Sequence, residues 1–395
     1  MNTVSHQPEI KGWCPGALRP MMSGDGLVVR VRPRGGRLSP EQAKGIADLA
    51  AQYGNGLIDL SARANVQVRG LSDKTHGPMV DGLRGLGLTD MSTEAEARRN
   101  IVVTPFWQHG DGTSELVRAL TDALALSDGP QTPGKFGYAV DCGPAPVLQS
   151  VSADIRIERG NGGGLIVRAD GSDYGAGVTM ETAAATALEL ARWFMDAGGS
   201  SDGRGRMAAL LARGVTLPER FATTGAIRPT NNQPAPGPSA QGFLVSFPFG
   251  QMHASTLSDL SAFGFLRVTP WRMMLIEGAA KAPEISNLIT DPHDPLLRVV
   301  ACTGAPGCPQ ALGATRPFAA ALAARLPQGT LAHVSGCTKG CAHPSAAALT
   351  LVARRSGTFD LIHDGKASDL PERTGLLPEN LVSTPDLLTE LSNAP

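Results

Sequence analysis

Two short stretches near the C-terminal end of the chain decide the fold: CTGAPGC at residues 302–308 and SGCTKGC at residues 335–341. They place four cysteines in two pairs, Cys302-x5-Cys308 and Cys337-x3-Cys341. Four thiolates suit either zinc or an iron–sulfur cluster. Structural zinc usually takes C-x2-C or C-x4-C knuckles, whereas a bulky cluster needs small residues that bring backbone N–H groups close to sulfur. The spacing therefore predicts a [4Fe-4S] cluster, with zinc and buried structural cysteines as the alternatives.

The composition is that of a folded chain of several domains. The 395 residues are 42% hydrophobic, and 35 basic against 36 acidic residues leave a net charge of −1. At ~150 residues per domain the chain holds two or three domains, and its balanced charge argues against bulk-electrostatic binding of nucleic acid. We see no window of ~18 apolar residues that predicts a membrane span, and the N-terminus MNTVSHQPEIKGWCPG lacks the apolar region of a secretory signal. We expect a cytoplasmic metalloprotein that binds neither nucleic acid nor membrane.

The N-terminal part predicts a small unit of strands and one helix. Gly26–Arg32 is expected to form a strand. Ser39-Pro40 suits the N-cap and first position of a helix that runs to about Tyr53. Further strands are expected at Leu57–Leu60 and Ala62–Arg69. The order strand, helix, strand, strand is typical of an α+β sandwich.

A second segment resembles a diverged copy of this unit. A strand, a short helix and further strand are expected over residues 242–248, 257–263 and 265–278. When Glu277-Gly278 is aligned with Arg69-Gly70, Thr269 falls on Ser61. The matched spacing predicts an internal repeat. The stretch RPTNNQPAPGPSAQ at 228–241 is poor in apolar residues and is expected to link the two halves of a duplicated chain.

Basic and amide side chains alternate along the predicted strand Ala62–Arg69. Period-two geometry would put Arg63, Asn65, Gln67 and Arg69 on one face, beside Arg30 and Arg32 of the neighbouring strand. Guanidinium groups offer a planar fork to carboxylates, although a solvated sheet face is the alternative. The equivalent positions of the second copy are Trp271, Met273, Leu275 and Glu277. This asymmetry predicts one anion-binding site per chain.

The cysteine pattern and the duplicated plan resemble the sulfite/nitrite reductase superfamily, from about Gly16 to Leu388. The resemblance implies a duplicated α+β fold of two ferredoxin-like half-domains plus two larger α+β cluster-domain halves with pseudo-twofold symmetry. The implied boundaries are 16–90 and 242–290 for the half-domains, 96–228 and 296–390 for the larger domains, and 229–241 for the linker. Only 296–390 carries the cluster cysteines, and in the family the last of them, here Cys341, also bridges to sirohaem iron.

Three short motifs resemble the tetrapyrrole-binding segments of that family. Arg63 matches the arginine of TxRxN, Arg99 that of RN(I/V), and Lys135 the first lysine of PxKFK. The second lysine of PxKFK is replaced by Gly137, which argues against reduction of sulfite or nitrite. The resemblance implies that the carboxylates of a tetrapyrrole bind to Arg63, Asn65, Gln67, Arg69, Arg99 and Lys135.

Other departures resemble one branch of the superfamily, the precorrin-3B synthases. They include CPGALRPM at 14–21 and Lys339, where reductases tend to have asparagine. The branch implies an O2-dependent monooxygenase of cobalamin biosynthesis that hydroxylates precorrin-3A at C20 and closes a γ-lactone to C1. It also implies an electron-donating NAD(P)H-dependent reductase and a second, mononuclear non-haem iron, and Gly137 adds the expectation of no sirohaem. The alternatives are a small sirohaem-dependent sulfite or nitrite reductase and a non-catalytic carrier.

Three further residues receive no firm role from the sequence. No His-x-His or His-x3-His pair is present, so no ligand set for a second iron stands out and no catalytic residue is assigned. His343, two residues after Cys341, is expected to support the cluster or to pack. Cys142 falls near the position of Cys337 in the other half, and Cys14 stands apart from the four.

Overall fold

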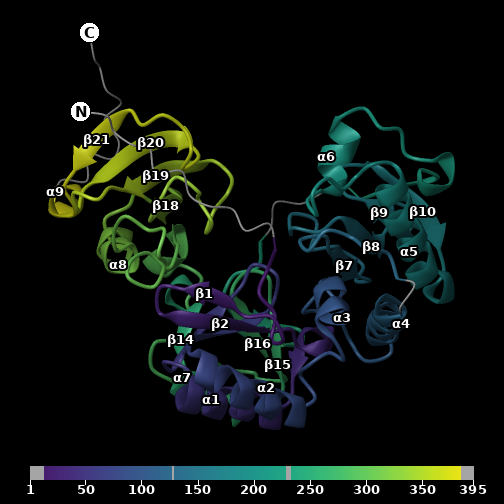
Figure 1. Cartoon of the computed structure of the whole chain (residues 1–395), viewed down its shortest axis with the longest axis horizontal. Helices are drawn as coiled ribbons and strands as arrows, with labels where there is room; N and C mark the ends of the chain where they lie inside the picture. The colour runs from purple at the N-terminus through teal and green to yellow at the C-terminus, as the bar shows by residue number, and fades with distance from the viewer. Residues whose placement is uncertain (1–12, 127–128, 228–232, 384–395) are drawn as a thin grey trace. The chain divides into compact units, whose positions relative to one another are not determined.

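The computed structural model describes residues 13–126, 129–227 and 233–383. Within these ranges the chain forms four β-sheets with helices packed against them (Figure 1), so the predicted α+β class is confirmed. The described chain divides into two compact units, residues 13–21 with 27–290 and residues 22–26 with 291–383. Residues 1–12, 229–232 and 384–390, on which parts of the predicted N-terminus, linker and last domain fall, lie outside the described ranges.

Two five-stranded sheets form the half-domains. The first sheet consists, in spatial order, of β1 (Met21–Ser23), β2 (Gly26–Val31), β5 (Val66–Leu71), β4 (Leu57–Leu60) and β14 (Gln251–His253). The second consists of β12 (Gly237–Ser239), β13 (Gly242–Ser246), β16 (Met273–Glu277), β15 (Leu266–Val268) and β3 (Arg37–Leu38). The helices are α1 (Pro40–Tyr53), α2 (Asp73–Gly85), α7 (Ala254–Ser261) and the 3-10 turns η1 (Arg34–Gly36) and η3 (Pro248–Gly250). The end of the predicted linker thus forms the edge strand β12.

The two half-domains exchange one strand each. β3 follows the first copy's turn η1 but pairs with β15 of the second sheet, where Leu38 lies opposite Leu266. β14 follows η3 in the second copy but pairs with β4 of the first sheet, where Met252 lies opposite Ile58. Each exchanged strand covers an edge that would otherwise expose unpaired backbone groups. The half-domains therefore share one apolar core, and their strand order repeats as the predicted pseudo-twofold symmetry requires.

The start of α1 confirms the prediction made from its sequence. Ser39 is the N-cap, Pro40 is the first helical residue, and Ser39 and Gln42 form a reciprocal capping box. The helix buries Ile46 and three alanines and packs against α7. By contrast, the predicted strand Ala62–Arg69 is wrong at its beginning, because β5 starts only at Val66.

The remaining two sheets repeat each other as well. The six-stranded sheet consists of β11 (Thr224–Gly225), β10 (Tyr174–Val178), β9 (Leu165–Ala169), β8 (Ile155–Arg159), β7 (Tyr138–Asp141) and β6 (Ile101–Val103). The five-stranded sheet of the second unit consists of β17 (Val299–Ala301), β18 (Ala332–Ser335), β19 (Ala347–Ala353), β20 (Phe359–Gly365) and β21 (Arg373–Leu376). In both, three parallel strands are followed by antiparallel ones, so the duplication extends to the larger domains.

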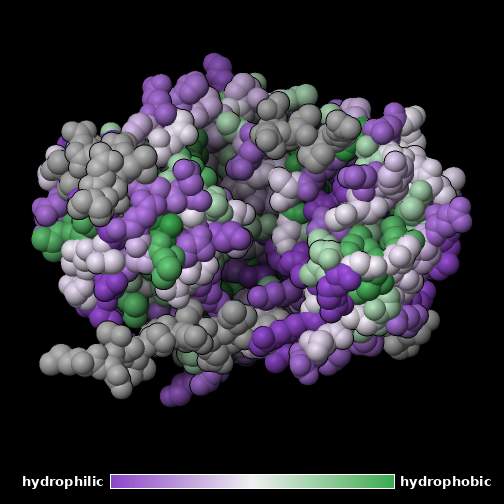
Figure 2. All heavy atoms as spheres, turned by 90° about the horizontal axis from the view of Figure 1, so that it is seen from above, coloured by the Kyte–Doolittle hydropathy of each residue, from purple (hydrophilic) through white to green (hydrophobic). Residues whose placement is uncertain are grey.

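Helices cover these sheets. In the larger unit they are α3 (Thr93–Arg98), α4 (Thr113–Ala125), α5 (Met180–Asp196), α6 (Met207–Ala212) and the turn η2 (Glu219–Phe221). In the smaller unit they are η4 (Pro295–Arg298), α8 (Arg316–Ala323) and α9 (Pro378–Ser383). Across the described ranges, no helix combines the length and apolar character needed to span a membrane. The face seen in Figure 2 mixes many hydrophilic residues with smaller apolar areas.

Candidate functional site

A tight loop, not a strand, presents Arg63. The backbone N–H of Ser61 donates to the carbonyl of Asn65 at 3.0 Å, and the hydroxyl of Ser61 accepts from the N–H groups of Arg63 and Asn65 at 3.3 and 3.2 Å. Ala64 has a positive φ of 53°, which closes the turn. This loop therefore sets the positions of Arg63 and Asn65, and the period-two alternation predicted from the sequence does not.

The second copy contains the same loop with different side chains. Thr269 Oγ1 accepts from the N–H groups of Trp271 and Met273 at 3.3 and 3.2 Å, and Arg272 has a φ of 60°. The alignment of Thr269 with Ser61 is thus confirmed, and Trp271 stands where the first copy has Arg63. Met273 and Trp271 join an apolar cluster that also contains Leu244, Leu275 and Phe106. The ring centroids of Phe106 and Trp271 lie 6.2 Å apart. The predicted asymmetry between the copies is confirmed.

The guanidinium of Arg63 lies against the loop that precedes β7. Its Nη2 donates to the carbonyl of Lys135 at 2.8 Å. A Cβ added to Gly137 would lie 3.3 Å from Arg63 Nη1, 2.9 Å from Asn100 Nδ2 and 3.0 Å from the Asn100 carbonyl. The missing second lysine of PxKFK and the position of Arg63 are therefore linked, because a side chain at 137 would meet groups that Arg63 and Asn100 already occupy.

Arg30, on the neighbouring strand, joins Arg63 and Lys135, and these three cationic side chains are called the basic group below. Arg30 on β2 lies opposite Gln67 on β5, and its Nε and Nη2 donate to Gln67 Oε1 at 3.1 and 2.6 Å. Within the described ranges no carboxylate forms a salt bridge with Arg30, Arg63 or Lys135. Gln67 thus orients Arg30, and the negative charge of Asp154 acts on Arg63 without a salt bridge between them. Burial lowers the pKa of Arg63.

Arg69 and Asp59 form a buried ion pair. Arg69 Nη1 donates to Asp59 Oδ2 at 3.0 Å, and both side chains are less than a tenth exposed. The register of the second copy puts Arg267 and Glu277 at the corresponding positions, where they form the same pair with the charges exchanged, at 2.6 Å. Both copies therefore use this position for a structural ion pair, and these contacts favour a supporting role for Arg69 over direct binding of a ligand.

Arg99 is likewise engaged inside the protein. Its Nε and Nη2 donate to the two carboxylate oxygens of Asp90 at 2.8 Å each, and its Nη1 donates to the Arg32 carbonyl at 3.2 Å. The next residue, Asn100, donates from Nδ2 to the Phe136 carbonyl at 2.8 Å. Asn65 is 4% exposed. The substrate-binding prediction for Arg99 and Asn65 stays untested, and the contacts of Arg99 join the end of β2 to the segment between α2 and α3.

A residue without a predicted role, Cys14, lies within the basic group. Burial by itself would raise the pKa of the Cys14 thiol, but the positive charges of Arg30, Arg63 and Lys135 outweigh burial and lower it. The order of these residues in the chain gave no sign of this, because Cys14 is 16 to 121 positions away from the three cations. The CPG sequence marked the segment as distinctive and was the only signal.

The segment that carries Cys14 is held by a buried carboxylate. Glu96 accepts from the N–H groups of Ala17 and Leu18 at 2.6 and 3.1 Å, and it forms an ion pair with Arg32 at 3.5 Å. A Cβ on Gly16 would lie 2.0 Å from Glu96 Oε2, so only glycine allows this approach. The glycine of CPGAL is therefore needed for the contact with Glu96, and this contact fixes the backbone next to Cys14.

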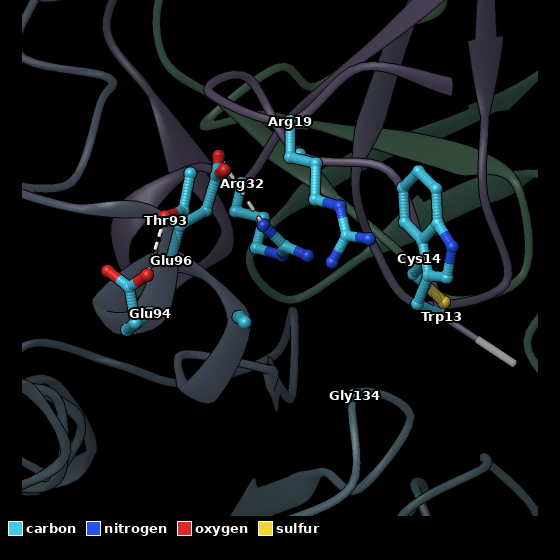
Figure 3. A pocket seen from close by; sticks show the side chains of 10 residues that line it. Trp13, Cys14, Arg19, Arg32, Thr93, Glu94, Glu96 and Gly134 are labelled. Carbon is cyan, nitrogen blue, oxygen red and sulfur yellow. Dashed lines mark hydrogen bonds and ion pairs between the residues drawn. The ribbon is translucent and has the colours of Figure 1, made fainter. Parts of the chain in front are cut away.

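A cavity of about 390 Å³ opens beside Cys14 (Figure 3). Its lining includes Trp13, Arg19, Arg32 and Gly134, together with Glu94 and Glu96. The guanidinium of Arg19 stacks on Trp13, with 4.1 Å between its central carbon and the ring centroid. Arg32 is 6% exposed, and its Nε and Nη1 have no hydrogen-bond partner among the described residues. Burial lowers the pKa of Arg32 to about 10, which leaves it charged at neutral pH. The cavity therefore carries two basic and two acidic side chains.

The four clustered cysteines lie in two loops of the smaller unit. Cys302 and Cys308 follow β17, and Cys337 and Cys341 follow the neighbouring parallel strand β18. Burial raises the pKa values of Cys337 and Cys341, and the thiols of the other loop add to the increase. The two loops therefore bring the four thiols into electrostatic range of one another.

The surroundings of these thiols fit an iron–sulfur cluster. The Gly336 N–H donates to Cys302 Sγ at 3.1 Å, and a Cβ on Gly336 would lie 3.4 Å from that sulfur. Gly304 and Gly340 have positive φ angles of 67° and 62°. No group of three or more His, Cys, Asp or Glu side chains close enough for one metal ion occurs in the part of the chain that the structure describes. This arrangement is compatible with a cubane, in which each thiolate binds a different iron.

His343 and Cys142 are both packed against other parts of the protein. The ring of His343 contacts that of buried His333 edge-on, with centroids 5.7 Å apart, and its Nε2 lies 3.2 Å from the Ala346 carbonyl. Cys142 is 2% exposed, and burial raises its pKa to about 11. The strand registers align Cys142 with Gly336, one residue before Cys337. An inert thiol packed in the core accounts for Cys142.

Residues 19–86 match the family described as the nitrite/sulfite reductase ferredoxin-like half domain. This segment includes most of the predicted first half-domain, with Arg30 and Arg63 of the basic group. The resemblance to the sulfite/nitrite reductase superfamily is confirmed.

Individual relatives agree with this result. The chain is 28% identical to a precorrin-3B synthase of Sinorhizobium sp over 420 aligned positions, which cover 91% of this chain and 84% of that protein. It is 29% identical over 135 positions to the ferredoxin–nitrite reductase of Synechococcus elongatus, covering 32% of this chain and 26% of that protein. The NirA protein of Mycobacterium tuberculosis has a similar fold, with a TM-score of 0.65 and 17% identity over 91% of this chain and 79% of that chain.

Proposed function

We propose that the chain is an oxygen-dependent precorrin-3B synthase, a monooxygenase that hydroxylates precorrin-3A at C20 and closes a γ-lactone to C1 in cobalamin biosynthesis. The observation that carries the proposal is the similarity to a precorrin-3B synthase over 91% of this chain and 84% of that protein. The similarity to a ferredoxin–nitrite reductase covers only 32% of this chain. A cytoplasmic location belongs to the proposal, because the electrons are drawn from NAD(P)H.

Three cations that form no salt bridge among the described residues support a ligand with several carboxylates. Arg30, Arg63 and Lys135 converge on one group, and no acid of the described chain forms a salt bridge with them. Cations that are buried or partly buried without an acidic partner are unfavourable, and a carboxylated tetrapyrrole would offset that cost through charge-assisted hydrogen bonds. In this proposal Arg63, Lys135 and Arg30 bind substrate carboxylates, while Gln67 orients Arg30.

Lactone formation needs positioning more than it needs an added catalyst. The acetate of ring A is part of the substrate, so it can attack C1 intramolecularly once oxygen has been inserted across C1–C20. Groups that hold the other carboxylates keep this acetate close to C1, and such proximity corresponds to a high effective molarity. The role of the basic group is therefore to bind and orient the macrocycle, and arginine does no proton transfer because it stays protonated.

Cys302, Cys308, Cys337 and Cys341 would hold the [4Fe-4S] cluster, which supplies electrons one at a time when bound. Two electrons are required per turnover, because one atom of O2 enters the substrate and the other leaves as water. A partner NAD(P)H-dependent reductase is proposed as their source. A second mononuclear iron remains part of the proposal without assigned ligands.

The proposal includes no sirohaem. Its support is Gly137, whose position leaves no room for the second lysine of PxKFK while Arg63 and Asn100 keep their places. The second candidate is a small sirohaem-dependent sulfite or nitrite reductase, favoured by the half-domain match and by the partial similarity to a nitrite reductase.

Turnover of precorrin-3A separates the candidates. The protein is purified anaerobically, its iron and acid-labile sulfide are measured, and it is supplied with precorrin-3A, a reductase, NADH and isotopically labelled O2. A synthase yields a lactone product that contains one labelled oxygen atom. Absence of that product from protein with a full cluster, together with reduction of sulfite or nitrite, would establish the second candidate instead.

A further inference from the structure

The loop that carries Lys135 is held at two points. The Lys135 carbonyl accepts from Arg63 Nη2 at 2.8 Å. Two residues further along, the Gly137 N–H donates to Asp154 Oδ2 at 3.0 Å, and the Gly137 carbonyl accepts from the Asp154 N–H at 2.7 Å. Asp154 therefore engages both backbone groups of Gly137. A Cβ on that glycine would lie 3.3 Å from Arg63 Nη1, so the position of this loop bears on Arg63 as well as on Lys135.

The carboxylate of Asp154 is fully buried, and its hydrogen-bonding capacity is used inside the protein. The residue is 0% exposed. Besides the N–H of Gly137, its oxygens accept from the Met207 N–H at 2.8 Å and from Arg206 Nε at 2.9 and 3.2 Å. Arg206 also donates from Nη2 to a hydroxyl and a carbonyl of residues 152–153, each at 3.1 Å. Asp154 itself is thus closed to a ligand, and any influence on binding acts through the groups that it holds.

The second of the larger domains forms the same backbone arrangement without this carboxylate. The strand registers place Ala348, which is exposed, where the first copy has Asp154. In both copies the next residue donates its backbone N–H at 3.2 Å to a carbonyl just before the neighbouring parallel strand: Ile155 to Gly137 and Leu349 to Leu331. The sheet therefore tolerates alanine at this position, and the carboxylate is present in the copy whose loop carries Lys135.

We propose that Asp154 is a positioning residue of the basic group. It fixes the loop at Gly137, so that Lys135 and Arg63 meet carboxylates of the same precorrin-3A molecule. The inference rests on the proposed function, because it takes the basic group as the substrate-binding site. Asp154 touches no substrate in this arrangement and acts through the backbone of the loop.

Titration of Asp154→Asn with precorrin-3A tests the proposal. An amide has one acceptor oxygen, so at least one of the donors around it would face an N–H group instead. Precorrin-3A should bind roughly tenfold or more weakly, while the iron and sulfide contents stay full. Asp170→Asn is the matched control, because Asp170 is an acid at the end of the neighbouring strand β9 that pairs with Arg156 at 2.9 Å. It should leave the affinity unchanged.

A double-mutant cycle with Arg63→Ala separates positioning from a loss of stability. If Asp154 acts through the loop, Arg63→Ala should weaken binding less in the Asp154→Asn background than in the wild type, by a factor of roughly five or more. A loss of stability alone would shift urea denaturation and leave the cost of Arg63→Ala the same in both backgrounds.

Hydrogen exchange of the wild type provides a measurement that needs no variant. The Gly137 amide should be protected in the free protein, and precorrin-3A should not change its protection, because the loop is already in place. If Asp154→Asn does not fold, this measurement decides the proposal. Equal affinities of wild type and Asp154→Asn, an additive cycle, or protection that appears only with precorrin-3A overturns the proposal and leaves the proposed function intact. A wild type that binds no precorrin-3A contradicts the proposed function, and the positioning role with it.

Discussion

Replacement of Arg63 by alanine isolates the electrostatic part of substrate binding. The guanidinium donates one hydrogen bond to the Lys135 carbonyl at 2.8 Å and forms no salt bridge within the described ranges. Its remaining N–H groups are therefore available to a substrate carboxylate. Loss of one charge-assisted contact costs about 1.5–3 kcal/mol, so precorrin-3A should bind roughly 10- to 150-fold more weakly to Arg63→Ala. Arg63→Lys should recover only part of the affinity, because a point charge replaces a planar fork.

The assay is an anaerobic titration with precorrin-3A, followed by the absorption of the macrocycle, on protein whose iron and sulfide contents have been measured. Arg84→Ala is the matched control, because Arg84 is exposed on α2 and its ion-pair partner among the described residues is the likewise exposed Asp81. The cluster absorption should be the same in all variants. If Arg63→Ala binds precorrin-3A as tightly as the wild type, the basic group is a solvated surface and the placement of the substrate is wrong.

Four further outcomes are expected. Serine at any of the four cluster positions, Cys302, Cys308, Cys337 or Cys341, should abolish the cluster absorption and the activity. A full content of iron and sulfide in such a variant would contradict the assignment. Acid–acetone extraction should yield no stoichiometric iron tetrahydroporphyrin, since Gly137 replaces the second lysine of PxKFK; its recovery favours the reductase candidate. Arg69→Ala should lower the free energy of unfolding by about 3–5 kcal/mol, because it removes the cation that pairs with the buried Asp59 carboxylate, and unchanged urea denaturation would argue that Arg69 serves a ligand instead. Burial raises the pKa of Asp141 to about 6 in the folded protein, above the ~3.9 of an unfolded chain. Between these two pKa values the folded state binds a proton at Asp141 that the unfolded state has lost. The contribution of Asp141 to the free energy of unfolding is therefore largest below about pH 4, and it falls by about 2–3 kcal/mol as the pH rises through 6. Comparison of the wild type with Asp141→Asn at several pH values should show that difference, and parallel pH profiles would exclude it.

Local patterns determined much of the architecture directly from the sequence. The capping box at Ser39 and the spacing that aligns Thr269 with Ser61 depend on hydrogen bonds between residues a few positions apart. Such contacts form wherever the local sequence permits them, so a sequence pattern is sufficient to predict them. The same is true of the cysteine spacing, because small residues beside Cys302 and Cys337 are a local requirement for close approach to sulfur.

Only the tertiary structure decided which basic residues share a site. Arg69 and Arg63 look equivalent in the sequence, yet Arg69 pairs with Asp59 across two strands while Arg63 leaves the sheet in a loop closed by Ala64. The exchange of β3 and β14 between sheets and the convergence of Cys14 with Lys135 likewise join residues far apart in the chain. Periodicity assigns a residue to a face, but the charge that lies opposite it depends on the packing of distant segments, which no local pattern contains.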